Sequence, residues 1–168
     1  SEVGGATLVL VGGAGAIGAA VARAAAALDM RVVDAALPGR TPRDSGLEVL
    51  PLELALARAD YVSLHVPLAP GTERLVDAAF LARMKPSSVL INTARGPIVD
   101  EDALLETLDG GGIAAAYLDV LAVEPPPSGS SSDALARNPR AVVTPHTAWS
   151  TAAARKRLVA TAVGDIRR

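Results

Sequence analysis

The sequence predicts an α/β fold of the Rossmann type, a doubly wound parallel sheet with helices on both faces, in three layers and a single domain. Short runs of Val, Leu and Ile alternate with Ala-rich segments of helical periodicity along the chain. The first apolar run ends in a glycine-rich turn that opens a helix. The 168 residues suffice for one core and show no internal repeat, so we expect a single domain over residues 1–168.

The first quarter of the chain sets this alternation. Residues 8–11 form a β-branched run that ends in glycines, which predicts a buried strand. Residues 16–28 are Ala-rich, with larger apolar side chains at helical spacing, and predict a helix. Residues 31–33 predict a second strand. The Pro-, Gly- and Arg-rich residues 38–45 predict a loop.

The middle of the chain continues the pattern. A short helix is predicted over residues 52–59, and a strand over residues 61–66 ends at a proline. A helix over residues 72–82 and a strand over residues 88–92 follow. A helix over residues 100–108 has acidic residues in its first turn and is followed by three glycines.

The last part predicts two more strands and a final helix. Residues 113–120 predict a strand, and the Pro-, Ser- and Gly-rich residues 125–132 predict a loop. Residues 142–144 predict the last strand, and residues 148–168 the final helix. In a parallel sheet of this kind ligands bind beyond the carboxyl ends of the strands, so residues that directly follow strands are the candidate site.

The composition excludes several kinds of site. No cysteine is present, which rules out thiolate catalysis, disulfides and cysteine-ligated zinc. The two histidines lie on separate elements, and we predict no metal site. A net charge of −2, with both signs mixed along the chain, predicts neither a nucleic-acid partner nor a membrane partner. We expect a cytoplasmic protein, because no leader and no apolar stretch of ~20 residues occurs.

The turn at residues 13–18 has the spacing G-x-G-x-x-G between a predicted strand and a predicted helix. In this context Gly13 permits the turn, Gly15 lets a pyrophosphate approach the backbone, and Gly18 lets the helix pack against the strand. The helix amino terminus, with Ala16 and Ile17, offers N–H groups to phosphate. The turn therefore predicts dinucleotide binding.

The choice between NAD and NADP stays open. An acidic residue that binds the adenosine ribose is expected ~20 residues after the turn, where this sequence has Ala36. Asp34 lies on the same strand face, either as a ribose ligand or as a satisfied, partly buried carboxylate. Arg40 and Arg43 follow in the loop, either as ligands of a 2′-phosphate or as solvated charges.

Three residues that follow predicted strands form a candidate reactive set. Arg95 could hold a carboxylate through two parallel hydrogen bonds. His146 could move a proton near neutral pH, and Glu124 as its partner would favour the charged imidazole. Taken singly, each could equally be a surface or loop residue. Taken together at one edge of a sheet, they predict acid–base chemistry on a carboxylate substrate.

Several other residues are candidates near this edge. Asp119 could accept a hydrogen bond from a carboxamide such as that of nicotinamide, or could simply cap the sheet edge. Trp149 could form a wall of a substrate pocket or anchor the final helix, and His65 could pack or line the cofactor. The complete predicted cofactor set is Gly13, Gly15, Ala16, Ile17, Gly18, Asp34, Arg40, Val66, Pro67, Thr93, Ala94, Asp119 and His146.

These motifs resemble the D-isomer-specific 2-hydroxyacid dehydrogenases, with the likeness strongest over residues 84–104 (MKPSSVLINTARGPIVDEDAL). The segments LDV at 118–120, EP at 124–125 and TPH at 144–146 match in order and spacing. The form PHTAW at 145–149 looks most like the glycerate/hydroxypyruvate reductases and the C-terminal-binding-protein corepressors. The likeness covers nearly the whole chain.

The resemblance implies an oxidoreductase that uses NAD or NADP to interconvert 2-oxo acids and D-2-hydroxy acids. It places the family's substrate arginine on Arg95, its relay acid on Glu124, its acid–base histidine on His146 and its carboxamide ligand on Asp119. The sequence departs from the family pattern at Ala36 and at Asp29, where a glycine usually ends the first helix. The family often forms homodimers through this domain.

The resemblance also implies a second, substrate-binding domain, which we expect to be absent from these 168 residues. We therefore expect a cofactor domain that turns over poorly alone. The alternative is a non-catalytic dinucleotide-sensing or corepressor-like binding module, which would not need the three reactive residues. A short-chain type of oxidoreductase would need a Tyr-x-x-x-Lys motif, and neither tyrosine is followed by lysine at that spacing.

Overall fold

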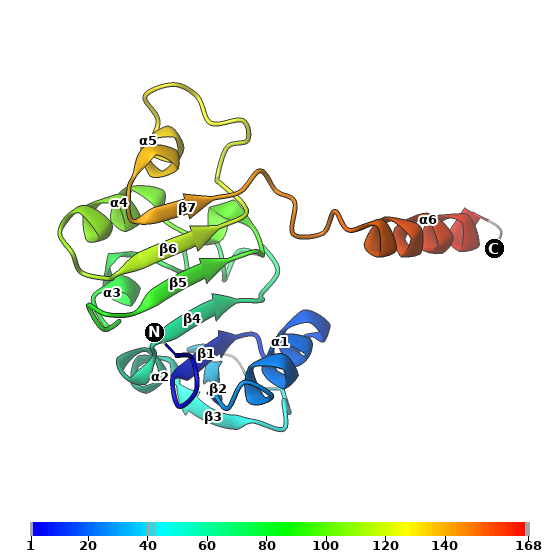
Figure 1. The fold of residues 1–168 in the computed structure, drawn as a ribbon, viewed down its shortest axis with the longest axis horizontal. Helices are drawn as coiled ribbons and strands as arrows, with labels where there is room; N and C mark the ends of the chain where they lie inside the picture. Colours follow the sequence, from blue (N-terminus) through cyan, green and yellow to red (C-terminus); the bar gives the residue numbers. More distant parts are fainter. Residues whose placement is uncertain (1, 40, 42, 167–168) are drawn as a thin grey trace.

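The computed structural model describes residues 2–39, 41 and 43–166. A seven-stranded sheet, parallel throughout, forms the centre of the molecule in the order β3-β2-β1-β4-β5-β6-β7 (Figure 1). The strands are β1 (Thr7–Val11), β2 (Arg31–Ala36), β3 (Glu48–Pro51), β4 (Tyr61–Leu64), β5 (Val89–Asn92), β6 (Ala115–Leu118) and β7 (Ala141–Val143). This topology confirms the predicted doubly wound α/β fold.

The helices that connect the strands are short. They are α1 (Ala16–Ala26), α2 (Leu52–Arg58), α3 (Ala78–Leu81), α4 (Glu101–Asp109) and α5 (Ser131–Arg137), with a 3-10 turn at Gly96–Ile98. The longer α6 (Ala152–Ile166) follows the last strand. Right-handed crossovers place α1 on one face of the sheet and the connections after β3 on the other.

Alternation along β1 divides the core into two layers. Leu8 and Leu10 pack with Ala22 and Ala25 of α1 in one buried cluster. Val9 and Val11, which alternate with these leucines along β1, point to the opposite face. They belong to the larger cluster there, with apolar side chains of α2, α3, α4 and α5. Both faces of β1 are therefore buried, as expected for the central strand of a parallel sheet.

One part of the sheet is open on the α1 side. Tyr117 of β6 lies beside Val142 of β7 in the register of the sheet, and these side chains are 47% and 48% exposed. Ile91 of β5, the neighbour of Tyr117 on the other side, is partly buried. Because the crossovers after β4 all run on the other face, α1 alone of the described helices packs on this side, and it packs on β1 and β2.

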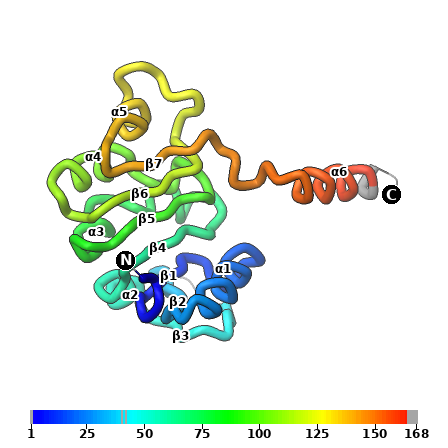
Figure 2. The backbone as a smooth tube through the Cα atoms, in the orientation of Figure 1, coloured from blue at the N-terminus to red at the C-terminus, as the bar shows by residue number. Residues whose placement is uncertain are grey.

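Helix α6 extends away from the rest of the molecule (Figures 1 and 2). Its apolar side chains Leu158 and Val159 are 60% and 62% exposed. Trp149, just before this helix, is 52% exposed, and the helix does not lie on the sheet (Figure 1). Of the two roles considered for Trp149, the anchor of the helix against the sheet is therefore wrong.

Two elements were missing from the sequence prediction. Strand β3 is a short edge strand that pairs with β2, and Glu48 there pairs with Arg31 at 2.7 Å. Helix α5 begins within residues predicted as a loop. Ser130 caps it by accepting a hydrogen bond from the N–H of Asp133, and its first turn is polar. Neither segment has the long apolar periodicity on which the prediction relied.

Several helices and strands begin or end at residues other than those predicted from the sequence. The helix predicted over residues 72–82 is reduced to α3, because Thr72 holds a buried turn and Val76 bridges to Val99. The final helix begins at Ala152 rather than at residue 148. Strands β4 and β6 are shorter than predicted, and β2 is longer. The first helix ends at Ala26, and Asp29 follows with a φ of 57°, the left-handed conformation that glycine adopts more readily.

Candidate functional site

The glycine turn lies between β1 and α1, at the point where the strand order reverses. A Cβ atom on Gly18 would lie 2.5 Å from the carbonyl oxygen of Gly12, and one on Gly15 would lie 3.3 Å from the same oxygen. The turn is therefore as tight as its sequence predicts. Gly15 is the N-cap of α1 and no side chain caps the helix, so the amino terminus leaves N–H groups for an anion.

A pocket of about 370 Å³ adjoins this turn. Its walls come from the carboxyl ends of β1, β2 and β4 and include Gly15, Ala36, Val66 and Pro67. Such a hollow at the switch point of the sheet is where a doubly wound fold binds a dinucleotide. The glycine cradle and the pocket together fit the adenosine and pyrophosphate of the predicted cofactor.

Asp34 lines this pocket, but one of its carboxylate oxygens is bound to the turn. Its side chain is 7% exposed, and its Oδ1 accepts a hydrogen bond from the N–H of Gly13 at 2.9 Å. A Cβ atom on Gly13 would lie 2.9 Å from the Asp34 carboxyl carbon. Of the two interpretations, the satisfied carboxylate describes this geometry. Arg40 lies outside the described residues. Ile17 is 67% exposed at the start of α1.

Asp119 follows β6 and organises the segment that carries the histidine. Its Oδ1 accepts hydrogen bonds from the Thr144 hydroxyl at 2.5 Å and from the N–H of Thr147 at 2.9 Å, and its Oδ2 accepts one from the N–H of Ala148 at 2.9 Å. Burial opposes the charged form, but these donors and the nearby His146 leave the pKa of Asp119 below its usual value. The carboxylate is thus a structural hub for residues 144–148.

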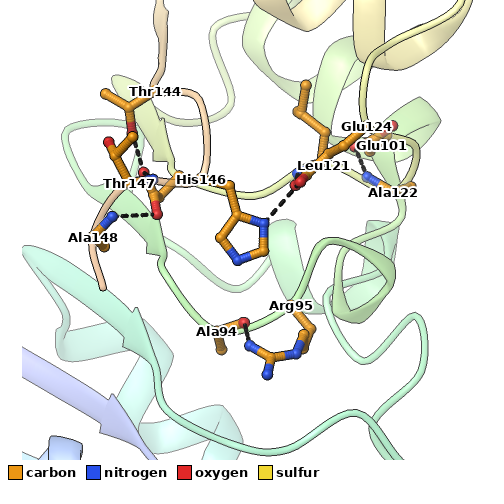
Figure 3. A network of polar contacts seen from close by, with 11 residues as sticks. Ala94, Arg95, Glu101, Leu121, Ala122, Glu124, Thr144, His146, Thr147 and Ala148 are labelled. Carbon is orange, nitrogen blue, oxygen red and sulfur yellow. Dashed lines mark hydrogen bonds and ion pairs between the residues drawn. The ribbon is translucent and has the colours of Figure 1, made fainter. Parts of the chain in front are cut away.

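His146 is held firmly by its backbone. Its N–H donates to the carbonyl oxygens of both Asp119 and Thr144 at 2.9 Å, and its φ is 53°. This left-handed conformation is uncommon for residues other than glycine. The turn directs the imidazole toward Glu124 and toward the loop of Ala94 and Arg95 (Figure 3).

The predicted relay pair forms. His146 Nδ1 lies 2.7 Å from Glu124 Oε2, and Glu124 Oε1 accepts a hydrogen bond from the N–H of Leu121 at 2.8 Å. Partial burial would raise the pKa of Glu124, but these two donors outweigh it and lower the pKa. Because the carboxylate can only accept, Nδ1 carries the hydrogen in this pair, and Nε2 is left for a substrate.

Arg95 reaches the same place from β5. Buried Asn92 at the end of this strand shapes the loop: its Nδ2 donates to the carbonyl oxygen of Arg95, and its Oδ1 accepts from the N–H of Ala94, both at 3.0 Å. The Arg95 guanidinium donates to the carbonyl oxygen of Ala94 at 2.6 Å and remains exposed. Thr93 is exposed beside it.

Arg95, Glu124 and His146 line one pocket of about 220 Å³. The structure therefore brings the three predicted reactive residues together. Gly96 also lines it and was missed as a site residue. A Cβ atom on Gly96 would lie 1.9 Å from the carbonyl oxygen of Leu121, so only glycine lets the loops after β5 and β6 approach this closely. Asn92, also missed, is a polar residue at the end of an apolar strand, which is a signal the sequence does carry.

Two features are absent from residues 2–39, 41 and 43–166. No group of three His, Asp or Glu side chains lies close enough to hold a metal ion. No helix among these residues is both long enough and apolar enough to cross a membrane.

Known proteins share both the sequence and the fold. Residues 1–148 match the family described as D-isomer specific 2-hydroxyacid dehydrogenase, NAD binding domain. Glycerate dehydrogenase from Methylorubrum extorquens is 42% identical over 149 residues, which are 89% of this chain and 45% of that protein. Glyoxylate reductase from Korarchaeum cryptofilum is 41% identical over 159 residues, covering 94% and 47% of the two chains.

A crystal structure of the D-isomer specific 2-hydroxyacid dehydrogenase from Lactobacillus delbrueckii ssp. bulgaricus, in its NAD-complexed form, superposes with a TM-score of 0.87 at 34% identity. It covers 98% of this chain and 53% of the other. The chain thus spans about half the length of the relatives it matches. The match to the NAD-binding domain confirms the prediction of a nicotinamide dinucleotide cofactor. On sequence and fold together, this chain belongs to the D-isomer specific 2-hydroxyacid dehydrogenase family.

Proposed function

We propose that this chain is the dinucleotide-binding domain of an enzyme that interconverts 2-oxo acids and D-2-hydroxy acids. The observation that carries the proposal is the His146–Glu124 pair at 2.7 Å, in the same pocket as Arg95. A bound nicotinamide dinucleotide supplies or accepts the hydride at C2 of the acid. Gly13, Gly15 and Gly18 hold its pyrophosphate, with the amino terminus of α1.

His146 is the acid–base residue in this proposal. In the reductive direction the protonated imidazole donates its Nε2 proton to the substrate oxygen at C2, and in the oxidative direction the neutral imidazole takes that proton back. Glu124 accepts the hydrogen of Nδ1 in both directions, which fixes the ring orientation and stabilises the imidazolium. The lowered pKa of Glu124 keeps this partner ionised at neutral pH.

Arg95 binds the substrate in this proposal. A guanidinium matches a carboxylate through two parallel hydrogen bonds and can polarise the neighbouring carbonyl. The guanidinium now donates a hydrogen bond to the Ala94 carbonyl on the exposed surface. Replacing this bond by bonds to a substrate carboxylate costs little free energy. Asp119 adds an acceptor for the nicotinamide carboxamide while it holds the His146 segment.

The three reactive side chains are too open to exclude water. Arg95 is exposed, and the His146 and Glu124 side chains are 42% and 36% exposed. Water exclusion and substrate alignment supply much of the rate in such sites. We therefore assign residues 1–168 to cofactor binding, and we assign the covering of the substrate to a second domain, so that the 168 residues alone turn over poorly.

The proposal is tested by calorimetric titration of the chain with NADH and with NADPH. Binding of at least one is expected, and binding of neither would contradict it. In the protein that carries this domain, His146→Ala should reduce the turnover of glyoxylate or hydroxypyruvate about a thousandfold, within the range of general acid–base catalysis. If turnover survives His146→Ala, His146 is not the acid–base residue. If the protein that carries this domain binds the cofactor without any turnover, a non-catalytic sensing module becomes the better description.

A homodimer is the proposed assembly. Tyr117 and Val142 expose apolar surface on the uncovered half of the sheet, and parallel sheets are normally covered on both faces. Light scattering after size exclusion should give a dimer mass that falls to a monomer mass in Tyr117→Glu. A monomeric parent protein would reject this assembly.

We also propose a cytoplasmic location, where nicotinamide dinucleotides and 2-oxo acids are abundant. Fractionation of cells that produce the protein is the test, and recovery in a membrane or secreted fraction would contradict it.

A further inference from the structure

We propose that the adenosine end of the cofactor pocket selects a 2′-phosphorylated ribose, so that this domain prefers NADPH over NADH. The inference rests on the proposed function, because it concerns the same cofactor site. It is carried by three features of the 370 Å³ pocket: a missing carboxylate at Ala36, an engaged carboxylate at Asp34, and an arginine from the following loop.

Ala36 is the last residue of β2 and lines the pocket. In folds of this kind an acidic side chain at the end of the second strand binds the ribose hydroxyls and repels a 2′-phosphate. Alanine does neither. The position therefore removes a major attraction for NADH and a major repulsion of NADPH.

Asp34 is already engaged by the glycine turn through one of its two carboxylate oxygens. It supplies the one carboxylate among the residues that line this pocket, and its Oδ1 accepts the Gly13 N–H at 2.9 Å. The side chain is 7% exposed and lies against the Gly13 backbone. Because an unpaired buried N–H is costly, this bond holds Oδ1 toward the turn and leaves one carboxylate oxygen for a ligand.

Arg43 and Thr41 line the pocket from the loop between β2 and β3. A guanidinium and a hydroxyl are the donors that suit a phosphate monoester, and arginine binds it bidentately. The neighbouring Asp44 does not line the pocket, and its Oδ1 accepts the N–H of Gly46 at 2.9 Å. A cationic and a hydroxyl donor thus line the same pocket as Ala36.

The experiment measures dissociation constants of the 168-residue chain for NADPH and NADH by calorimetry. We expect NADPH to bind at least tenfold more tightly, and 2′,5′-ADP to displace it where 5′-AMP does not. Arg43→Ala should weaken NADPH binding tenfold or more, through loss of a charge-assisted hydrogen bond to the 2′-phosphate, and leave NADH binding unchanged. Arg83→Ala, which changes an exposed arginine away from this pocket, is the matched control and should change neither.

Two further variants test the separate roles of Ala36 and Asp34 in the choice of cofactor. Ala36→Asp should reverse the preference toward NADH. Asp34→Asn retains an acceptor for the Gly13 N–H and should leave both constants within threefold; a selective loss of NADH affinity would assign Asp34 to the ribose and overturn the inference. Equal or tighter binding of NADH by the parent chain would overturn the inference alone. Binding of neither dinucleotide would overturn the proposed function and the inference with it.

Discussion

Asp119 shows how one side chain can set the geometry of a whole segment. Three donors from residues 144–148 converge on its two oxygens, and the His146 N–H binds its main-chain carbonyl. The side chain is only 6% exposed, so these hydrogen bonds replace the water that burial removes. The position of His146 therefore depends on a residue that need not touch the substrate.

Removing the charge at this hub should destabilise the domain. In Asp119→Asn one carboxylate oxygen becomes an NH₂ group that faces an N–H or hydroxyl donor. We expect the free energy of unfolding to fall by about 1–3 kcal/mol, the cost of one buried unsatisfied group. Urea denaturation followed by circular dichroism measures this change. Glu106→Gln, on an exposed part of α4, should stay within about 0.5 kcal/mol.

Two substitutions at His146 distinguish the role of its imidazole from the role of its left-handed backbone conformation. Glycine tolerates a φ of 53° without the steric cost that alanine incurs. We expect His146→Gly to be more stable than His146→Ala by about 1 kcal/mol in urea denaturation, while both lose the acid–base group. Equal stabilities would show that the left-handed turn relaxes when the imidazole is removed.

At the scale of elements, the loops after β5 and β6 approach each other through Gly96. The carbonyl of Leu121 occupies the space where a side chain at residue 96 would begin. This contact lets Arg95 on one loop and Glu124 on the next line the same pocket.

A methyl group at this contact should separate the two loops. We expect Gly96→Ala to lower the free energy of unfolding by about 1–3 kcal/mol or more, the usual cost of overpacking. Thermal denaturation provides the measurement, and the control is Gly4→Ala, where the nearest atom would lie at an ordinary 3.7 Å. A Gly96→Ala variant that melts with the parent protein would contradict the close approach.

Elements with long apolar periods were predictable, and those fixed by local polar contacts were not. The strands β1, β4 and β5 and helix α4 carry buried runs or acidic starts that the sequence shows directly. Helix α5 depends on a serine cap, and the segment before α3 depends on the buried Thr72 hydroxyl. The reactive set was predictable because its residues follow strands of one parallel sheet. The sequence left two interpretations of Asp34 open, because the choice between them depends on its distance to Gly13.

The whole molecule should lose stability in two steps as the pH falls. Burial lowers the pKa of His65, which lies partly buried with its Nε2 3.0 Å from the Ser63 hydroxyl. A histidine whose folded pKa is lowered stabilises the fold above its usual value of 6.5, and this contribution disappears as the pH falls below that value. Asp60, Asp119 and Glu124 also have lowered pKa values, so their contributions persist until the pH falls below the usual carboxylate range.

Urea denaturation between pH 8 and pH 3, a range chosen to span both groups, tests this expectation. His65→Gln should flatten the decrease near pH 6 and leave the decrease below pH 4 unchanged. A parent protein whose stability is constant from pH 7 to pH 5 would contradict the role of His65.

The strand order also has a kinetic consequence. Strands β1 and β4 are neighbours, yet the Thr7–Asp60 hydrogen bond between them joins residues 53 positions apart in sequence. To pair these strands, the chain must first close a large loop. Loop closure has an entropic cost that is offset only after the strand contacts have formed, so this pairing is slow. The cleft for the dinucleotide forms between these same strands. The ability to bind a nucleotide should therefore appear late in folding. Fully folded molecules would bind the cofactor, and partly folded ones would not.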